Sequence, residues 1–503
     1  MSVRMRELLD TLFDAHPGEL PYLVHGDHPV SRGEVRAAVA VEAAVFAGHG
    51  VGEGHTVMLQ IPPSCTQIEV LLALWQLGAQ VMLVDHRLKP SEVDALRSLC
   101  HPQFMVGAGT AGRSSLRFEP RYEVVTSRYP DGRPAATEHR LVQFSSGSTG
   151  LPKVIGRTAA SLAAEIERFT RIEGMPTPGE RVLLLSSTAH SFGLIAGVLH
   201  SLAAGVSAVF ARRVSAKDIL AAASRHDIHV IFGTPFHYEL LSTARDLPAL
   251  PALRAAVSGG EIMPSQTAAR FADRFGTGVG ESYGTTETGV IAMEVSGASR
   301  PSVGRPAPGV RLRVREGELD VWLPDGSPYL HASGGDRYAD GWLHTHDRAE
   351  LDSSGAVRLL GRGDSLVVIG GLKVDLTEVE AVLCRHPGVN GAVVVHAGAT
   401  EAYVSVAPDG PSSGNCCAGA GTGWPTTRCP ASSTSWRTCP APPTASSSGA
   451  ATPCSPALPT VDPPTAPCRP PPSIPVAQKG CAPCRRRCRR RSATSCSARS
   501  ARR

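Results

Sequence analysis

The stretch Phe144-Ser145-Ser146-Gly147-Ser148-Thr149-Gly150-Leu151-Pro152-Lys153 (FSSGSTGLPK) follows a short apolar run, Leu141-Val142. It contains four hydroxyl side chains, two glycines and a lysine. Glycine permits a close approach of the backbone, hydroxyls donate hydrogen bonds and lysine adds a positive charge. The stretch therefore predicts a phosphate-binding loop. The alternative is a flexible Ser/Gly turn, because short runs of these residues are common in turns.

This loop differs from two other glycine motifs that carry chemistry. A Walker A loop has the pattern Gly-x4-Gly-Lys-Ser/Thr, whereas Gly147 and Gly150 are three residues apart and Lys153 comes three residues after Gly150. No Gly-x-Ser-x-Gly elbow surrounds these serines. Residues 159–169 are typical of a helix, and we expect the amides at its N-terminus to lie near the bound anion.

The bulk composition indicates a soluble globular protein. The 503 residues are 42% hydrophobic and 19% charged, and the length allows two to four domains. The longest apolar stretch, Val70 to Val84, contains Gln76 and Gln80 and is too short to span a bilayer. No N-terminal signal segment is visible, and the cysteines before residue 415 are scattered singly, which fits a reducing compartment. We therefore expect a cytoplasmic protein.

The formal net charge of +5 comes from the end of the chain. From Ala407 onward there are 13 Lys or Arg residues and 2 Asp, so the preceding part is mildly acidic. This distribution argues against nucleic-acid binding by the main body.

Apolar runs at residues 57–61, 81–84, 182–185 and 230–232 predict buried strands, with helical segments such as 68–77 and 216–223 between them. This alternation predicts an α/β fold with mostly parallel sheets and flanking helices. A denser strand-and-turn region at 309–360 predicts a small barrel-like unit. We expect a large domain at residues 1–361, the start of a small α+β C-terminal lid domain at 362–406, and a disordered Pro/Ser/Cys/Arg tail at 407–503.

Four further segments resemble motifs of one protein family. They are Ser258-Gly259-Gly260-Glu261, Tyr283-Gly284-Thr285-Thr286-Glu287, Gly341-Trp342-Leu343-His344-Thr345-His346-Asp347, and Gly361-Arg362-Gly363-Asp364 followed by Gly370-Gly371-Leu372-Lys373-Val374. Together with FSSGSTGLPK, in this order and spacing, they resemble the adenylate-forming (AMP-binding) superfamily, in its acyl-CoA and aryl-CoA synthetase branch. The resemblance covers residues 10 to 406.

The resemblance implies a role for each matching residue. Tyr283 would stack on adenine, Asp347 would accept both ribose hydroxyls, and Glu287 would hold Mg²⁺. The implied nucleotide-binding residues are Ser145, Ser146, Gly147, Ser148, Thr149, Gly150, Lys153, Gly259, Gly260, Glu261, Tyr283, Gly284, Thr285, Asp347 and Arg362. The implied catalytic residues are Thr286, Glu287, His190 and Lys373, with Glu287 as the metal ligand and Asp364 as the hinge.

The resemblance implies ATP-dependent activation of a carboxylic acid to an acyl-adenylate, followed by transfer to a thiol. The acid would be a fatty or aryl acid, because no aspartate for an amino-acid substrate lies between Ser186 and Gly193. The cofactors would be ATP, Mg²⁺ and CoA. Two alternatives remain: loading of the phosphopantetheine thiol of a carrier protein, and an impaired protein that only binds the nucleotide or the adenylate. His190 itself has the alternative of a structural histidine.

The sequence departs from the family pattern at two places. His344-Thr345-His346-Asp347 stands where the family has Arg-Thr-Gly-Asp, so a side chain replaces a glycine near the expected ribose. Arg157 stands where many relatives have histidine after the phosphate loop. We expect these changes to affect efficiency and not the fold.

The tail lacks the lysine that the family needs for adenylation, since no lysine lies between Lys373 and Lys479. We hypothesise that a shifted reading frame caused this loss. Codons that start one base before each residue of 424–430 allow Leu-Ala-Asp-Tyr-Lys-Val-Pro, a typical family segment, and the same shift over 439–446 allows Pro-Arg-Thr-x-Asn-Gly-Lys. The alternative is a functional tail, in which Cys481, Cys484, Cys488 and Cys496 bind zinc and the arginine runs bind nucleic acid.

Overall fold

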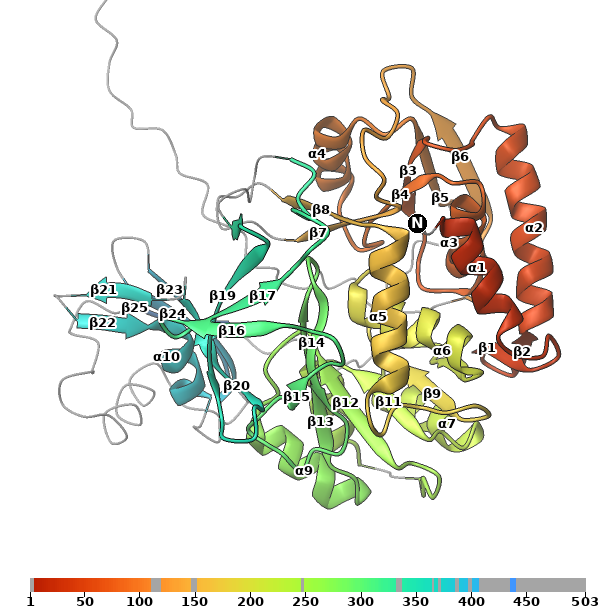
Figure 1. The fold of residues 1–503 in the computed structure, drawn as a ribbon. Coiled ribbons are helices and arrows are strands. Elements are labelled where there is room, and N and C mark those ends of the chain that lie inside the picture. Colours follow the sequence, from red (N-terminus) through yellow and green to blue (C-terminus); the bar gives the residue numbers. More distant parts are fainter. Residues whose placement is uncertain are drawn as a thin grey trace, which may run out of the picture. The chain divides into compact units, whose positions relative to one another are not determined.

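The computed structural model describes residues 4–109, 119–145, 152–245, 248–331, 337–363, 366–369, 372–384, 389–396, 400–406 and 435–439. The described residues between 4 and 306 form two large sheets with flanking helices, and smaller sheets follow (Figure 1). In the described parts of the chain, no helix is both long and apolar enough to cross a bilayer.

The six-stranded sheet has the order β6-β5-β3-β4-β7-β8, with four parallel central strands and an antiparallel strand at each edge. Its strands are β3 (Thr56–Gln60), β4 (Gln80–Leu83), β5 (Phe104–Ala108), β6 (Val124–Arg128), β7 (Leu141–Ser145) and β8 (Lys153–Arg157). The helices between these strands are α3 (Cys65–Gln76) and α4 (Pro90–Cys100). Residues Cys65 to Trp75 of α3 are all buried, because α1 (Met5–Asp14) and α2 (Arg32–Gly48) pack over it.

The nine-stranded sheet has the order β15-β14-β13-β12-β11-β9-β10-β1-β2, and β13 through β1 in this order run parallel. Its strands are β1 (Pro21–His25), β2 (His28–Ser31), β9 (Arg181–Leu184), β10 (Ser207–Phe210), β11 (Val230–Gly233), β12 (Ala255–Gly259), β13 (Val279–Thr285), β14 (Gly289–Glu294) and β15 (Arg305–Pro306). The helices between them are α5 (Ala159–Arg171), the π-helix η2 (Phe192–Leu199), α6 (His200–Ala204), α7 (Ala216–Arg225), α8 (Pro235–Ser242) and α9 (Ser265–Phe275).

A third, antiparallel sheet follows the large sheets, and its Leu319, Val321 and Ala349 pack in a small core with Ile291 and Ala292 of β14. Its strands are β16 (Leu312–Arg315), β17 (Glu318–Trp322), β18 (Tyr338–Ala339), β19 (Trp342–Leu351) and β20 (Val357–Arg362). It is the barrel-like region expected from the dense turns of residues 309–360.

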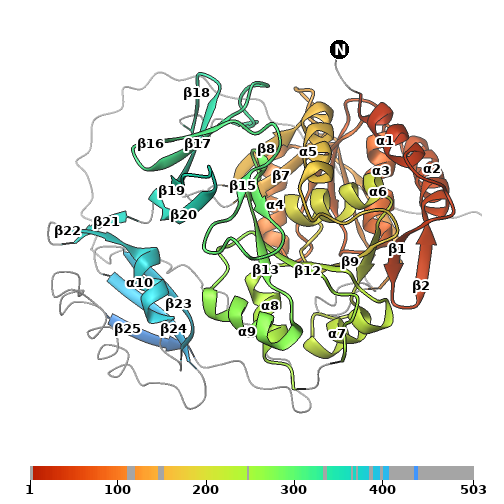
Figure 2. The same cartoon turned by 60° about the horizontal axis from the view of Figure 1, so that its bottom comes forward.

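The last described segments are short. A hairpin of β21 (Leu366–Ile369) and β22 (Leu372–Asp375) precedes α10 (Leu376–Leu383), which lies beside β23 (Val389–His396) in Figure 2. β23 pairs with β24 (Thr400–Val406), and β25 (Ser435–Cys439) adds a third strand parallel to β24. The composition of the tail did not predict β25, although its Trp436 and Thr438 are residue types that favour strands. The other tail residues lie outside the described part of the chain.

These sheets confirm the predicted α/β class with mostly parallel sheets, flanking helices and a small barrel-like region. The domain boundaries at 361 and 406 remain predictions.

Candidate functional site

The predicted phosphate loop connects β7 to β8. Ser145 and Lys153 face each other in the antiparallel register, so the two ends of the loop are held side by side. Lys153 is buried at the start of β8. Five predicted loop residues lie outside the described part of the chain: Ser146, Gly147, Ser148, Thr149 and Gly150.

The expectation that a helix N-terminus serves this loop is wrong. The helix α5 begins at Ala159, after the whole of β8. A strand rises by about 3.3 Å per residue, so the five residues of β8 separate the first amides of α5 from Lys153, where the strand begins, by roughly 15 Å. These amides are capped locally instead, because the Thr158 hydroxyl accepts a hydrogen bond from the Ser161 amide at 3.1 Å.

The predicted adenine turn follows the carboxyl end of β12. Gly260 has φ +91°, a conformation that favours glycine, and a Cβ on Gly259 would lie 2.8 Å from the Phe192 ring. Both glycines are thus required by geometry, one by its backbone angle and one by a close neighbour. Glu261 is exposed next to them. The adjacent parallel strand β13 carries Tyr283, so both motifs lie at the same edge of the sheet, where α/β proteins bind ligands.

Tyr283, Asp347 and Arg362 come together from three strands, β13, β19 and β20. The Tyr283 hydroxyl donates to Asp347 Oδ2 at 2.6 Å, and Arg362 Nη1 lies 3.4 Å from Asp347 Oδ1. Burial raises the pKa of Tyr283 well above its usual range, and the Asp347 carboxylate raises it further. The phenol therefore stays a hydrogen-bond donor to the carboxylate for which the family resemblance implies a contact with the ribose.

The turn after β13 holds Thr286 and Glu287 between two threonines. The side chains of Thr285 and Thr288 bond each other at 3.1 Å, and the Thr288 amide donates to Thr285 Oγ1 at 3.2 Å. Gly284, before the turn, is paired with Val290 of β14. Glu287 is buried, and its Oε1 accepts a hydrogen bond from the Tyr329 hydroxyl at 2.9 Å. The carboxylate predicted to bind the metal is thus fixed in direction.

The departure at Arg157 is matched by a buried carboxylate. Arg157 Nη2 lies 2.7 Å from Glu165 Oε2, and both side chains are almost fully buried. Glu165 Oε1 in turn accepts from the Val290 amide at 3.0 Å, and a Cβ on Gly289 would overlap this carboxylate. Through the Val290 amide, the ion pair therefore supports the turn that carries Glu287.

The two departures on β19 lie near acidic residues of β17. His344 Nδ1 lies 2.6 Å from Asp320, which is buried and also accepts from Arg313 Nε at 2.9 Å. His346 has φ +60°, in the left-handed region, and its ring lies 3.5 Å from Glu318. This backbone angle explains why the family pattern has glycine at that position.

His190 lies on the segment before η2 and is fixed from the six-stranded sheet. Gln143 of β7 donates to the Ala189 carbonyl at 2.7 Å and accepts from the Ser191 hydroxyl at 2.7 Å. The His190 side chain is 59% exposed and lies 3.5 Å from the Asp85 carboxylate. A ring this exposed is not buried in the core, and a role of His190 in binding the acid stays a prediction.

Asp85 follows the carboxyl end of β4 and joins the two large sheets through His190. Burial alone would raise the pKa of Asp85, but hydrogen bonds from His190 and Arg87 outweigh it and lower that pKa far below its usual range. Asp85 is therefore an ionised acceptor, which favours a fixed orientation of the His190 ring.

Lys373 lies on β22, paired with Val368, and nothing is described of its side chain. Asp364, the predicted hinge, lies outside the described residues. The sequence did not single out Tyr329, Glu165, Gln143 or Asp85. Only Asp85 had a signal, because a polar residue directly after a buried parallel strand lies at the ligand-binding edge of a sheet.

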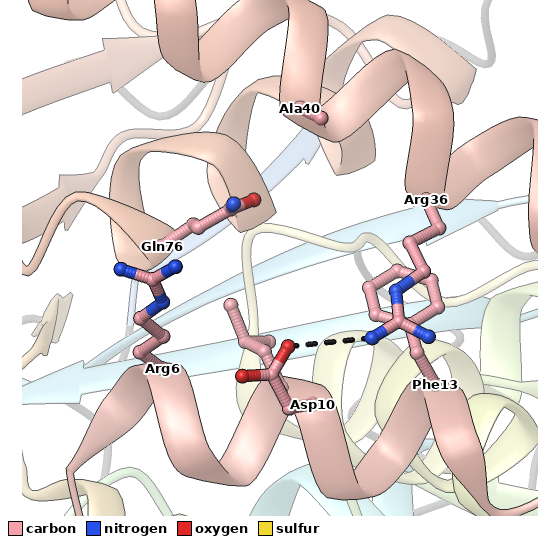
Figure 3. Close-up of a pocket in the computed structure, with 7 residues that line it drawn as sticks. Arg6, Asp10, Phe13, Arg36, Ala40 and Gln76 are labelled. Carbon is pink, nitrogen blue, oxygen red and sulfur yellow. Dashed lines mark hydrogen bonds and ion pairs between the residues drawn. The ribbon is translucent and has the colours of Figure 1, made fainter.

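A cavity of about 180 Å³ opens between α1, α2 and the end of α3, away from these motifs in the sequence. Its lining residues are Arg6, Leu9, Asp10, Phe13, Arg36, Ala40 and Gln76. Figure 3 shows Arg36 extending toward Asp10, with Nη2 3.5 Å from the carboxylate. The lining of this cavity contains none of the residues predicted for nucleotide or acid binding.

Comparisons with known proteins agree on one family. The family model described as AMP-binding enzyme matches residues 11–328. The chain is 27% identical to sulfoacetate–CoA ligase of Cupriavidus necator over 423 residues, which cover 75% of this chain and 81% of the relative. It is 27% identical to benzoate–CoA ligase of Thauera aromatica over 373 residues, which cover 69% of each chain.

Solved structures share the fold. ATP-bound MatB from Rhodopseudomonas palustris superposes with a TM-score of 0.74 at 20% identity, covering 86% of this chain and 95% of that one. The anthranilate CoA ligase AuaEII in complex with anthranoyl-AMP gives a TM-score of 0.72 at 20% identity, covering 86% and 93%. Because the family model spans more than half of the chain, this protein belongs to the AMP-binding enzyme family, and its relatives include acid–CoA ligases.

Proposed function

We propose that this chain activates a carboxylic acid with ATP to an acyl-adenylate and transfers the acyl group to the thiol of coenzyme A. The observation that carries this proposal is the convergence of Tyr283, Asp347 and Arg362 beside the Gly259-Gly260 turn. A flat ring, a side-chain-free turn and a carboxylate suit an adenosine. Membership of the AMP-binding family and the CoA-ligase relatives support the same activity.

Each part of the nucleotide would meet a different element. The adenine would lie between the Tyr283 ring and the Gly259-Gly260 backbone, and the ribose hydroxyls would donate to Asp347. Lys153 and the loop after β7 would hold the β- and γ-phosphates, and Thr286 would bond the α-phosphate. Because transfer of the adenylyl group, like other displacements at phosphorus, needs little covalent help from the protein, these groups act by positioning and by neutralising charge.

The residues present fit a magnesium ion that arrives with the nucleotide. Glu287 offers carboxylate oxygens, the ligand type that this hard cation prefers. In the part of the chain that the structure describes, no three His, Cys, Asp or Glu side chains are grouped to hold a metal alone. Mg²⁺ usually binds through one or two carboxylates plus substrate phosphates, which matches a single buried glutamate. When bound, the ion would neutralise charge on the phosphates.

The acid would bind near His190, with its carboxylate directed at the α-phosphorus. Attack in line releases pyrophosphate, and the thiol then displaces AMP from the adenylate. Asp364 would be the hinge between these steps, and the loop with Lys373 would line the thiol channel. No aspartate lies between residues 186 and 193 to pair with a substrate ammonium, so we propose an aryl or other non-amino acid.

A second candidate, an impaired enzyme that binds ATP but turns over poorly, is favoured by the missing lysine. No lysine occurs between Lys373 and Lys479, and we propose that a shifted reading frame removed it. Resequencing the coding DNA tests the frame directly. An intact frame without a lysine codon near residue 445 would contradict the shift.

The decisive experiment compares this 503-residue chain with the protein made from a gene in which one base is inserted upstream of the Trp424 codon to restore the other reading frame. ATP binding is measured by calorimetry, and pyrophosphate exchange is measured with benzoate, sulfoacetate, a fatty acid and an amino acid. We expect both chains to bind ATP and only the corrected chain to exchange well. Robust exchange by the 503-residue chain would refute the impairment, and absence of ATP binding from both chains would refute the proposed function.

A further inference from the structure

Tyr329 connects the metal carboxylate to the strand that begins with the loop lysine. Its backbone bridges Ile155 of β8, and the neighbours on each side reinforce this pairing. The Gly156 amide donates to the Pro328 carbonyl at 2.8 Å, and the Leu330 amide donates to the Val154 carbonyl at 2.9 Å. The side chain then reaches Glu287, 42 residues away in sequence, with its hydroxyl 2.9 Å from Oε1.

The orientation of the Glu287 carboxylate depends on this hydrogen bond. Among the residues that the structure describes, the Tyr329 hydroxyl is the hydrogen-bond partner of this carboxylate. Oε1 is thereby occupied, which leaves Oε2 for a further ligand. The neighbouring threonine bonds fix the backbone of the turn but do not reach the carboxylate.

We propose that Tyr329 is a positioning residue that orients Glu287 for magnesium and ties it to β8. This inference rests on the proposed function, because the metal would arrive with ATP. Partners of metal ligands orient them, and their loss typically costs about 10- to 100-fold in metal affinity. Since Lys153 begins β8, the same strand holds the predicted phosphate lysine and, through Tyr329, the predicted metal ligand.

The test compares ATP affinity with and without Mg²⁺ in the full chain and in Tyr329→Phe, by calorimetry. This change removes one hydroxyl and keeps the backbone bridge to Ile155. We expect the gain in ATP affinity on adding Mg²⁺ to fall about 10-fold. Tyr338→Phe is the matched control, because Tyr338 is also half-buried and donates to a backbone carbonyl, that of Leu323, at 3.0 Å. It should keep the full gain.

A double-mutant cycle shows whether Tyr329 acts through Glu287. Glu287→Gln should lose the magnesium gain, and adding Tyr329→Phe to it should change nothing more. The electron paramagnetic resonance spectrum of Mn²⁺ bound together with ATP gives a second readout. The spectrum should change with Tyr329→Phe and not with Tyr338→Phe.

Three outcomes separate the claims. An unchanged magnesium gain in Tyr329→Phe, or additive losses in the cycle, would overturn the role of Tyr329. A reduced gain that is non-additive with Glu287→Gln supports it. Failure of the parent chain to bind ATP would instead refute the proposed function, and this inference with it.

Discussion

Arg157 on β8 and His346 on β19 both replace a residue of the family pattern, and the fold accommodates them in opposite ways. Arg157 is buried against a buried glutamate, 2.7 Å away, so the change is built into the interior. His346 keeps a left-handed backbone angle of +60° near the surface, with only a 3.5 Å approach to Glu318. The first departure is compensated by a partner, whereas the second is tolerated as local strain.

This difference predicts the sign of the change in the free energy of unfolding when each departure is disturbed by mutation. Removing a partner from a buried ion pair leaves an uncompensated charge, which is costly. Relieving a strained backbone angle at a half-exposed position has the opposite sign. The predictions below test these two outcomes from the largest effect to the smallest.

Glu165→Gln should produce the largest loss. The amide oxygen can still accept from Val290, but Arg157 loses its counterion in the interior, and we expect a cost of about 3–5 kcal/mol in the free energy of unfolding. Urea denaturation measures it. Glu167→Gln on the same helix is the control, because Glu167 is 69% exposed and its pair with Arg171 is on the surface. A loss below about 1 kcal/mol would mean that the pair does not hold this region.

Asp320→Asn should cost less, because its partners are partly exposed. Asp320 is buried and contacts His344 at 2.6 Å and Arg313 at 2.9 Å, and an amide can satisfy only part of this set. We expect about 2 kcal/mol of destabilisation by the same urea measurement. The exposed turn residue Asp325 gives the control Asp325→Asn, which should be neutral. Equal stability of the two variants would show that His344 needs no compensation.

Tyr283→Phe tests the residue that contacts Asp347, the neighbour of His346. Loss of a hydrogen bond to a half-buried carboxylate should weaken ATP binding by about 1 kcal/mol. Because the pKa of Tyr283 is raised, the phenol stays protonated at neutral and mildly alkaline pH. The difference between variant and parent should therefore be the same at pH 7 and pH 9, by calorimetry. A difference that disappears at pH 9 would contradict the protonated donor.

The strands could be predicted from sequence because parallel strands buried on both faces are continuous apolar runs. Residues 57–61, 81–84, 182–185 and 230–232 correspond to β3, β4, β9 and β11 within one residue at each end. The motif glycines could be predicted for a similar reason, since φ at Gly260 and the packing against Gly259 admit no side chain.

The supporting contacts could not be predicted, because they join residues far apart in sequence. Tyr329 and Glu287 are 42 residues apart, and Glu165 reaches Val290 across 125 residues. No local pattern marks either partner. The misplaced helix N-terminus has a different cause: the sequence indicates a helix after the loop but not that the intervening residues extend away as β8.

His346→Gly should have the smallest effect and the opposite sign. Glycine adopts φ +60° without the steric cost that a Cβ carries, and the lost approach to Glu318 is a surface contact of little value. Glycine also gains freedom in the unfolded chain, which offsets part of the benefit, so we expect a net stabilisation of about 0.5 kcal/mol in urea. His49→Gly is the matched control, because His49 has φ −78°, where glycine relieves nothing and should destabilise. If His346→Gly lowers stability as His49→Gly does, the departure on β19 is compensated after all, and the contrast with Arg157 no longer holds.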